Sequence, residues 1–430
     1  MNEYDSELVR SILLEVGHVL TNEVESAEVV MLNTCAVREN AFNKIYARVG
    51  DLKYYRDNRK TRVGILGCMA QNIKDDLMQN RNIDFAAGPD NYRDLPKLIA
   101  EALDPSDGPD AITILSKDET YSDVSPDRAD DTVNAWLAVM RGCDNFCTFC
   151  VVPYTRGRER SRTLESVVEE ARKAVAAGKK QVTLLGQNVN SYRSGEHQFS
   201  HLMEAVAQIE GLARVRFTSP HPMDFPEELL RVIAKYPKLC KQIHLPLQAG
   251  SSEVLKRMNR GYTREEYMAV VSRIKLILPD AHISTDIIVG FPGETEEQFE
   301  ETVAVMNLVR FDSAYIYKYS PREGTLAKRR FPDDVEEVEK TRRIVKLNQL
   351  QNAHSLESLM RFVGRDCEIL IEKESTQLSE QQCQGRTDQG VTVVIPQDGS
   401  IKAGDLVTVR ISGHTSHVLM GQNPKVLRDR

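Results

Sequence analysis

Short apolar runs separated by helical patterns recur along the middle of the chain. The runs lie at residues 136–140, 182–185, 214–218, 243–247, 283–289 and 314–319. The clearest helical pattern extends from Thr163 to Ala177, with Thr163 as its expected N-cap and Gly178 just past its end. Another helix is expected where Thr295 and Gln298 form a capping box. Six strand–helix units predict an α/β parallel sheet, and six rather than eight predict a partial (β/α)₆ barrel, open on one side.

Different patterns flank this central segment. Before it, short helical patterns alternate with apolar runs at 29–32, 63–66 and 83–85, which predicts a small α/β domain. After it, apolar and polar residues alternate at 367–372, 391–395 and 406–411, which predicts a small antiparallel β-barrel. A stretch rich in Pro, Ser and Asp indicates a linker. The expected organisation is a first domain at 1–118, a linker at 119–133, the central domain at 134–361 and the small barrel at 362–430.

Composition is that of a globular enzyme. Of the 430 residues, 41% are hydrophobic and 28% are charged. No apolar run approaches the roughly 18 residues needed to span a bilayer, and the acidic, interrupted segment Met1–Leu20 resembles neither a signal peptide nor a transit peptide. Eight cysteines, three of them clustered, favour metal ligation in a reducing compartment over a disulfide framework. We therefore expect a cytoplasmic protein that makes no contact with a membrane.

The clustered cysteines carry the strongest chemical signal. Cys143, Cys147 and Cys150 form a C-x₃-C-x₂-C run directly after the apolar run at 136–140. Iron–sulfur clusters are usually held by four cysteines, so three thiolates leave one iron of a [4Fe–4S] cluster open. The spacing resembles that of the radical S-adenosylmethionine (SAM) enzymes, in which the open iron binds SAM and reduction yields a 5′-deoxyadenosyl radical. The alternative is a structural zinc site completed by a distant histidine.

Charge near these cysteines is basic, although the net charge of the chain is −7. Five arginines surround the cysteine run: Arg141, Arg156, Arg158, Arg160 and Arg162. Charge runs are usually solvated faces. Because this cluster lies beside the expected chemistry, it favours a surface for a polyanionic partner.

Longer motifs around these cysteines identify a family. They are Arg141-Gly-Cys143, Cys147-Thr-Phe-Cys150-Val-Val-Pro-Tyr-Thr-Arg156, Gly186-Gln-Asn-Val-Asn-Ser-Tyr192, Thr218-Ser-Pro-His-Pro222 and Asp286-Ile-Ile-Val-Gly-Phe-Pro-Gly-Glu294. Together they resemble the methylthiotransferase family of radical SAM enzymes, over the whole chain. The resemblance implies an N-terminal methylthiotransferase domain, a radical SAM barrel and a C-terminal TRAM domain. It implies an enzyme that uses SAM and [4Fe–4S] to add a methylthio group to C2 of N6-isopentenyladenosine at position 37 of tRNA.

The resemblance also implies a second [4Fe–4S] cluster, held by three cysteines of the first domain. Cys35 and Cys68 match two of them, in Asn-Thr-Cys35-Ala and Leu-Gly-Cys68-Met. The third is expected just upstream of Met1, together with the first strand of that domain. Either the start was assigned to an internal methionine, or the protein is shortened, or this family member has dispensed with the cluster. The alternative to the ligand role is that Cys35 and Cys68 are two buried thiols.

Polar residues at the strand–helix junctions are the candidates for binding SAM. Because ligands of such sheets lie at the carboxyl ends of the strands, we expect contacts from Gln187, Ser219, Asp286 and Gly290. Turn chemistry alone would also place such residues there. His244 is either a core histidine or an active-site group. No catalytic side chain beyond the cluster ligands is identified.

Two other functions remain open from the sequence. One is a methylthiotransferase that modifies an aspartate of a small-subunit ribosomal protein, and the other is a tRNA-binding protein without catalysis. For the enzyme we expect a tRNA anticodon stem–loop as partner, gripped by the small barrel with Arg386 and Arg410. An electron donor such as flavodoxin or ferredoxin is implied, and we expect a monomer.

Overall fold

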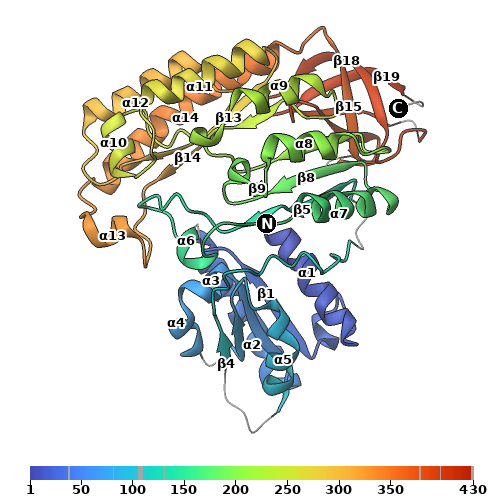
Figure 1. The fold of residues 1–430 in the computed structure, drawn as a ribbon, viewed down its shortest axis with the longest axis vertical. Helices are drawn as coiled ribbons and strands as arrows, with labels where there is room; N and C mark the ends of the chain where they lie inside the picture. Colours follow the sequence, from blue (N-terminus) through green and yellow to red (C-terminus); the bar gives the residue numbers. More distant parts are fainter. Residues whose placement is uncertain are drawn as a thin grey trace. The chain divides into compact units, whose positions relative to one another are not determined.

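Two compact units make up the protein. The computed structural model describes residues 1–36, 39–80, 82–104, 110–128, 132–376, 379–397 and 399–427. Unit 1 consists of residues 1–129, 140–162 and 320–330, and unit 2 of residues 130–139, 163–319 and 331–430 (Figure 1). The cysteine run at 143–150 thus packs as part of unit 1, with the N-terminal residues. Residues 129–131 of the expected linker at 119–133 lie outside the described residues.

Unit 1 is built on a parallel sheet in the order β1-β2-β3-β4. Its strands are β1 (Val29–Thr34), β2 (Arg62–Gly67), β3 (Phe85–Ala87) and β4 (Asp110–Ile112). Its helices are α1 (Asn2–Glu15), η1 (Val24–Ser26), α2 (Glu39–Arg59), α3 (Cys68–Asn72), α4 (Lys74–Met78), η2 (Tyr92–Asp94) and α5 (Leu95–Leu103). The predicted α/β fold is confirmed, although the strand expected at 83–85 begins only at Phe85. The further strand expected ahead of Met1 stays a prediction.

The remainder of unit 1 carries the cysteine run. A short antiparallel pair, β6 (Met140–Arg141) and β7 (Arg160–Ser161), closes the base of this segment. Helix α6 (Val152–Thr155) follows the last cysteine, and α13 (Leu326–Arg330) joins the unit through a bond from the backbone N–H of Ala327 to the carbonyl of Thr148, 2.8 Å long. The chain thus enters unit 1 at Met140 and leaves it at Arg162, and the β6–β7 pair holds these two ends of the cysteine segment together.

Unit 2 contains six parallel strands. They form two sheets, ordered β11-β8-β5 and β12-β13-β14, and a parallel bridge between Val215 and Leu239 links the segment before β12 to β11. The strands are β5 (Asn134–Ala138), β8 (Gln181–Leu185), β11 (Arg214–Phe217), β12 (Gln242–His244), β13 (His282–Val289) and β14 (Ser313–Lys318). The predicted partial barrel of six strand–helix units is confirmed.

Helices alternate with these strands as expected (Figure 1). In chain order they are α7 (Leu164–Ala176), η3 (Val189–Ser191), α8 (Phe199–Ala207), η4 (Pro222–Asp224), α9 (Glu227–Lys235), α10 (Ser252–Arg257), α11 (Arg264–Ile277), α12 (Glu296–Val309) and α14 (Glu337–Met360). A small hairpin of β9 (Arg193–Ser194) and β10 (His197–Gln198) precedes α8. Thr163 caps α7 by accepting from the N–H of Ser166, and Thr295 forms the expected capping box with Gln298. None of the helices in the described part of the chain is long and apolar enough to cross a membrane.

The C-terminal strands close into a barrel in the order β15-β16-β17-β19-β18. They are β15 (Asp366–Lys373), β16 (Gln382–Thr387), β17 (Thr392–Pro396), β18 (Leu406–His414) and β19 (Leu419–Val426). Four of the neighbouring pairs are antiparallel, whereas β17 and β19 pair in parallel. Five strands cannot alternate direction around a closed ring, so one parallel junction is unavoidable. The predicted small β-barrel is confirmed with this one departure from antiparallel pairing.

Two buried arginines of β11 bind the backbone of this barrel. Arg214 is 2% exposed and donates to the carbonyl of Glu368 at 3.0 Å and to that of Arg386. Arg216 is 9% exposed and donates to the carbonyl of Thr387 at 2.8 Å. Residues two apart on a strand point to the same face, so both guanidinium groups reach the barrel together.

Candidate functional site

The three clustered cysteines occupy a tight loop in unit 1. Cys143 and Cys147 are buried, Cys150 is half-buried, and all three are reduced thiols. The N–H of Cys150 donates to the carbonyl of Cys147 at 3.0 Å, and the N–H of Val152 donates to the sulfur of Cys150 at 3.5 Å. A backbone N–H directed at sulfur is a contact that an iron–sulfur ligand favours.

The donor chemistry of these three thiols fits an iron–sulfur cluster. Among the described residues, no group of three His, Cys, Asp or Glu side chains is close enough to hold one metal ion. In a four-iron cluster each cysteine binds a different iron, so its ligands stand farther apart than those of a zinc ion. The set of three thiols on one loop suits a [4Fe–4S] cluster, and no preformed zinc site accompanies it in the described part of the chain.

Gly142 makes the loop possible. Its φ is +79°, and a Cβ atom placed there would lie 1.9 Å from the carbonyl oxygen of Arg158. We predict that the Gly142→Ala protein loses most of its bound iron after anaerobic reconstitution, because positive φ costs about 1–3 kcal/mol for other residues and the clash adds to it. Gly178→Ala is the control, since its φ is +91° with open space around it. Equal iron content in the two variants would contradict the prediction.

Cys35 and Cys68 lie side by side at one edge of the unit 1 sheet. Cys35 follows β1 and Cys68 follows β2, and the last residues of these strands, Thr34 and Gly67, are paired in register. The carboxyl ends of neighbouring parallel strands meet at the same edge. The two predicted ligands of the second cluster are therefore adjacent, as a shared site requires.

The structure also brings Cys68 against the cysteine loop. Ala36, Cys68 and Val151 form one buried apolar cluster, and Val151 directly follows Cys150. Helices α3 and α6 contact each other. The Nε of Arg156 donates to the sulfur of Cys68 at 3.2 Å. The sequence analysis predicted two separate cysteine groups and did not predict this contact.

Asp5 of α1 connects the two ends of the cysteine segment. It is completely buried, and its carboxylate accepts from Arg141 at 2.8 Å and from Arg156 at 2.6 Å. The ring of Tyr121 lies under the guanidinium of Arg141, 4.7 Å from its carbon atom. Burial works to raise the pKa of Asp5, but Arg156 and Arg141 outweigh it, so the pKa lies below its ordinary value.

The sequence itself indicates that Asp5 is buried and needs a partner. Asp5 lies on the apolar face of α1, with Leu8, Val9 and Ile12 at helical spacing. A carboxylate on a buried face needs a cationic partner, and the arginines around the cysteines form one cluster that could supply it.

The expected basic surface around the cysteines is wrong. Arg141, Arg156, Arg160 and Arg162 are at most 7% exposed. Arg160 pairs with Asp90 at 3.0 Å, and Arg162 donates to the hydroxyl of Tyr4 at 3.3 Å. Only Arg158 of the five has an exposed side chain. Arg141, Arg156 and Arg160 neutralise buried carboxylates within unit 1, so these three present no surface to a polyanion.

The predicted SAM contacts lie in unit 2. Gln187 and Ser219 follow β8 and β11 at their carboxyl ends, as expected. The Oε1 atom of Gln187 is buried and has no hydrogen-bond partner among the described residues. Ser219 has a φ of +59°, a strained conformation that for a residue other than glycine often marks a functional site.

The structure does not place Asp286 at a strand end, where the sequence predicted it. It lies in the middle of β13 rather than at its end. Its Oδ2 is 3.1 Å from Nε2 of His244, whose Nδ1 is 3.0 Å from the hydroxyl of Ser284. Both residues are half-buried. His244 is thus a fixed partner of Asp286 on the neighbouring strand, not an apolar core residue.

Gly290 starts a rigid turn after β13. Its φ is +70°, and its N–H donates to Oε2 of Glu294 at 2.6 Å. Arg343 of α14 donates to the same oxygen at 2.9 Å. Burial, the largest effect, raises the pKa of Glu294 even with Arg343 beside it. A Cβ at Gly290 would meet the side chain of Lys340 at 2.4 Å, so glycine is required here by packing.

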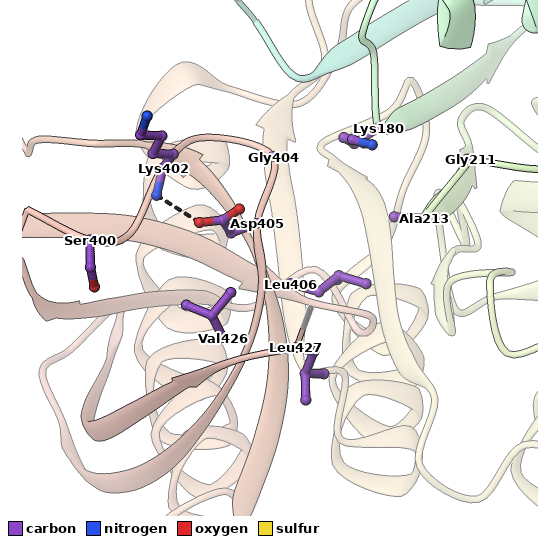
Figure 2. A pocket seen from close by; sticks show the side chains of 10 residues that line it. All are labelled: Lys180, Gly211, Ala213, Ser400, Lys402, Gly404, Asp405, Leu406, Val426 and Leu427. Carbon is purple, nitrogen blue, oxygen red and sulfur yellow. Dashed lines mark hydrogen bonds between the residues drawn. The ribbon is translucent and has the colours of Figure 1, made fainter. Parts of the chain in front are cut away.

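A cavity of about 380 Å³ opens in unit 2 at the other edge of the strands (Figure 2). Lys180 and Ala213, which line it, immediately precede β8 and β11, so it lies at their amino ends. Lys402, Asp405 and Leu406 line it from the C-terminal barrel. None of the predicted site residues lines this cavity, and its position separates it from the edge that carries Gln187 and Ser219.

Three models of known families match the chain. The Radical SAM superfamily matches residues 137–306, the Uncharacterized protein family UPF0004 matches residues 1–88, and the TRAM domain matches residues 360–422. These matches confirm the three kinds of domain expected and their order.

Curated relatives match almost the whole chain. A protein of Flavobacterium johnsoniae is 44% identical over 444 residues, covering 98% of this chain and 91% of the relative. A protein of Phocaeicola vulgatus is 45% identical over 430 residues, covering 98% and 93%. Both are named tRNA-2-methylthio-N(6)-dimethylallyladenosine synthase.

Solved structures share the fold at low identity. The radical SAM methyltransferase TsrM from Kitasatospora setae, with cobalamin and a [4Fe–4S] cluster bound, gives a TM-score of 0.59 at 15% identity, covering 76% of this chain and 71% of that one. The cobalamin-dependent SAM radical enzyme OxsB gives 0.50 at 13% identity, covering 81% and 53%.

Proposed function

The chain belongs to the family of radical SAM tRNA methylthiotransferases, and from this we propose that it attaches a methylthio group to C2 of N6-isopentenyladenosine at position 37 of tRNA. The observation that carries the proposal is the 44–45% identity over 98% of the chain to synthases named for that product. N6-isopentenyladenosine is the same nucleoside as the dimethylallyladenosine of those names.

The target atom explains why radical chemistry is needed. C2 of the adenine bears a C–H bond with no acidic proton and no leaving group, so acid–base catalysis has little effect on it. Bound SAM and a reduced [4Fe–4S] cluster supply a 5′-deoxyadenosyl radical, which no side chain can supply alone. The protein must hold these groups, admit the base and exclude water. Extruding the base costs a few kcal/mol of unstacking.

We assign the cluster ligands by loop. Cys143, Cys147 and Cys150 hold the cluster that binds SAM, supported by their spacing and by the N–H directed at the sulfur of Cys150. Cys35 and Cys68 belong to a second cluster, supported by their adjacency after paired strands. The family's second cluster takes three cysteines, and Cys35 and Cys68 are two of them.

We assign SAM contacts to the carboxyl edge of the unit 2 strands. The unpaired Oε1 of Gln187 is an acceptor suited to the ammonium group or a ribose hydroxyl of SAM. The carboxylate of Asp286, oriented by His244, suits ribose hydroxyls. Ser219 and the backbone at Gly290 complete the set, because both interrupt the strands in conformations with positive φ.

The C-terminal barrel is the proposed grip on the tRNA. Arg410 and Asp366 form an ion pair of 3.4 Å, with both side chains more than half exposed. Exposed pairs contribute little, so Arg410 can exchange its carboxylate for a phosphate. Arg386 is bound to Glu372 at 2.9 Å in a less exposed pair, and we propose it as a second phosphate contact. We propose a cytoplasmic monomer that takes electrons from a flavodoxin or ferredoxin.

Deleting the gene tests the proposal. We predict that tRNA from the deletion strain lacks 2-methylthio-N6-isopentenyladenosine and accumulates N6-isopentenyladenosine, as measured by mass spectrometry of digested tRNA. Complementation with the unchanged gene restores the product. Unchanged tRNA nucleosides, with a small-subunit ribosomal protein lighter by one methylthio group, would replace the proposal with the aspartate-modifying activity. No change in either would favour a non-catalytic tRNA-binding protein.

A further inference from the structure

Arg156 makes two kinds of contact with one buried guanidinium group. It is 4% exposed, its Nη2 donates to Asp5 at 2.6 Å, and its Nε donates to the sulfur of Cys68 at 3.2 Å. Its Nη1 is buried and has no hydrogen-bond partner among the described residues. The Asp5 contact fixes the plane of the guanidinium, so the direction of the other two nitrogens is set.

Arg156 belongs to one cysteine group and contacts the other. It follows Cys150 by six residues, directly after α6, whereas Cys68 lies 88 residues earlier in the chain. All of these residues are in unit 1. A residue of the loop proposed for the first cluster therefore reaches a sulfur proposed for the second.

Arg156, which binds Cys68, has a buried donor without an acceptor in the described part of the chain, and this indicates that a bound group supplies one. Besides Nη1 of Arg156, the hydroxyl of Tyr92 in the same unit is buried with no partner among the described residues. A buried unpaired donor costs roughly 1–3 kcal/mol, and a charged one costs more. The sulfur-rich surface of a bound cluster would supply acceptors to both groups.

We propose that Arg156 is a positioning residue for the second cluster, binding the sulfur of Cys68 through Nε and offering Nη1 to the bound cluster, while Asp5 holds it in place. The proposal rests on the assignment of Cys68 as a cluster ligand in the proposed function. It makes the loop of the first cluster a structural part of the second site.

The expected physical effect is on the reduction equilibrium of the second cluster. Hydrogen bonds to ligand sulfur and a nearby positive charge stabilise the reduced, more negative cluster, which raises its potential. Asp5 cannot cancel this effect, because its carboxylate is shared between Arg156 and Arg141. Removing Arg156 should therefore favour the oxidised cluster.

A potentiometric titration of the anaerobically reconstituted protein tests this. Cys143, Cys147 and Cys150 are changed to Ala together, so that only the second cluster contributes to the electron paramagnetic resonance signal. We expect Arg156→Gln to shift the reduction equilibrium about tenfold toward the oxidised form, which is 59 mV for a one-electron couple. Arg156→Lys should give a smaller shift, because it keeps the charge but cannot bind Asp5 and Cys68 at once.

Arg158→Gln is the matched control. Arg158 lies two residues further on, its side chain is 73% exposed, and it pairs with Asp144. We expect no shift for this variant. Arg156→Gln should fold, since the buried pair of Asp5 and Arg141 stays balanced.

The possible outcomes distinguish a failure of this inference from a failure of the proposed function. An intact second cluster with equal potentials in Arg156→Gln and Arg158→Gln would overturn the inference alone. Absence of any cluster in the triple cysteine variant, with Arg156 unchanged, would overturn the assignment of Cys68 and the inference with it. The tRNA product of the unchanged enzyme would be unaffected by the first outcome.

Discussion

Replacing Cys147 with alanine should abolish the formation of 5′-deoxyadenosine from SAM under reducing conditions. Cys147 is the central thiol of the loop and is buried, so no other side chain can take its place. A vacant ligand position destabilises a [4Fe–4S] cluster, and without the cluster SAM receives no electron. The measurement is chromatography of the nucleoside after anaerobic reconstitution, together with iron content. We expect product at background level.

Cys240→Ala is the control for this experiment. Cys240 is also buried, but it lies in unit 2 just before β12, away from any cysteine group in the sequence. Its loss should leave nucleoside formation within about twofold of the unchanged protein, since burial of one small thiol contributes only packing. Continued formation of 5′-deoxyadenosine by Cys147→Ala would show that the ligand set is wrong.

Replacing Asp5 with asparagine should destabilise unit 1 by roughly 3–5 kcal/mol, because it leaves the buried Arg141 and Arg156 without their counter-ion. Hydrogen exchange of peptides from α1 and from 140–162, followed in increasing urea, measures this stability for the unit concerned. Asp144→Asn is the control, since its pair with Arg158 is exposed and such pairs contribute at most about 1 kcal/mol.

The effect of Asp5 should depend on pH in one direction. Because the pKa of Asp5 lies below its ordinary value in the folded protein, its contribution is fully present above the unfolded pKa of about 3.9. It is lost as pH falls through the lower, folded value. The difference between the unchanged protein and Asp5→Asn should therefore stay constant near neutral pH and shrink only in acid. A difference that shrinks toward high pH would contradict the assignment.

Features with a local period or spacing were predicted well from the sequence. The strands of unit 2 and the caps at Thr163 and Thr295 depend on neighbouring residues, and the structure confirms them. The cysteine run is likewise local. Asp286 was misplaced, because it was assigned to a strand end although the apolar run at 283–289 already contains it, and the strand extends three residues beyond it.

Long-range pairing could not be read from the sequence in the same way. Asp5 lies 136 residues from Arg141 and 151 from Arg156, and nothing in the order of residues joins them. The arginine cluster was taken for a surface for the same reason, since a charge pattern does not show which charges are buried. The assignment of the cysteine loop to unit 1 follows from these pairs and so was equally hidden.

Arg214 and Arg216 limit how relatives can exchange their C-terminal barrels. Both arginines bind main-chain carbonyls, which every residue possesses, so amino-acid substitutions at 368, 386 and 387 leave the acceptors in place. An insertion in β15 or β16 moves those carbonyls away from two buried cations, of which Arg216 keeps Gln181 and Gln242 as acceptors. Chimeric enzymes that borrow a barrel of altered tRNA preference should therefore tolerate sequence divergence in these strands far better than a change in their length. The amino-acid composition of β15 and β16 can therefore vary, whereas their length and register are constrained.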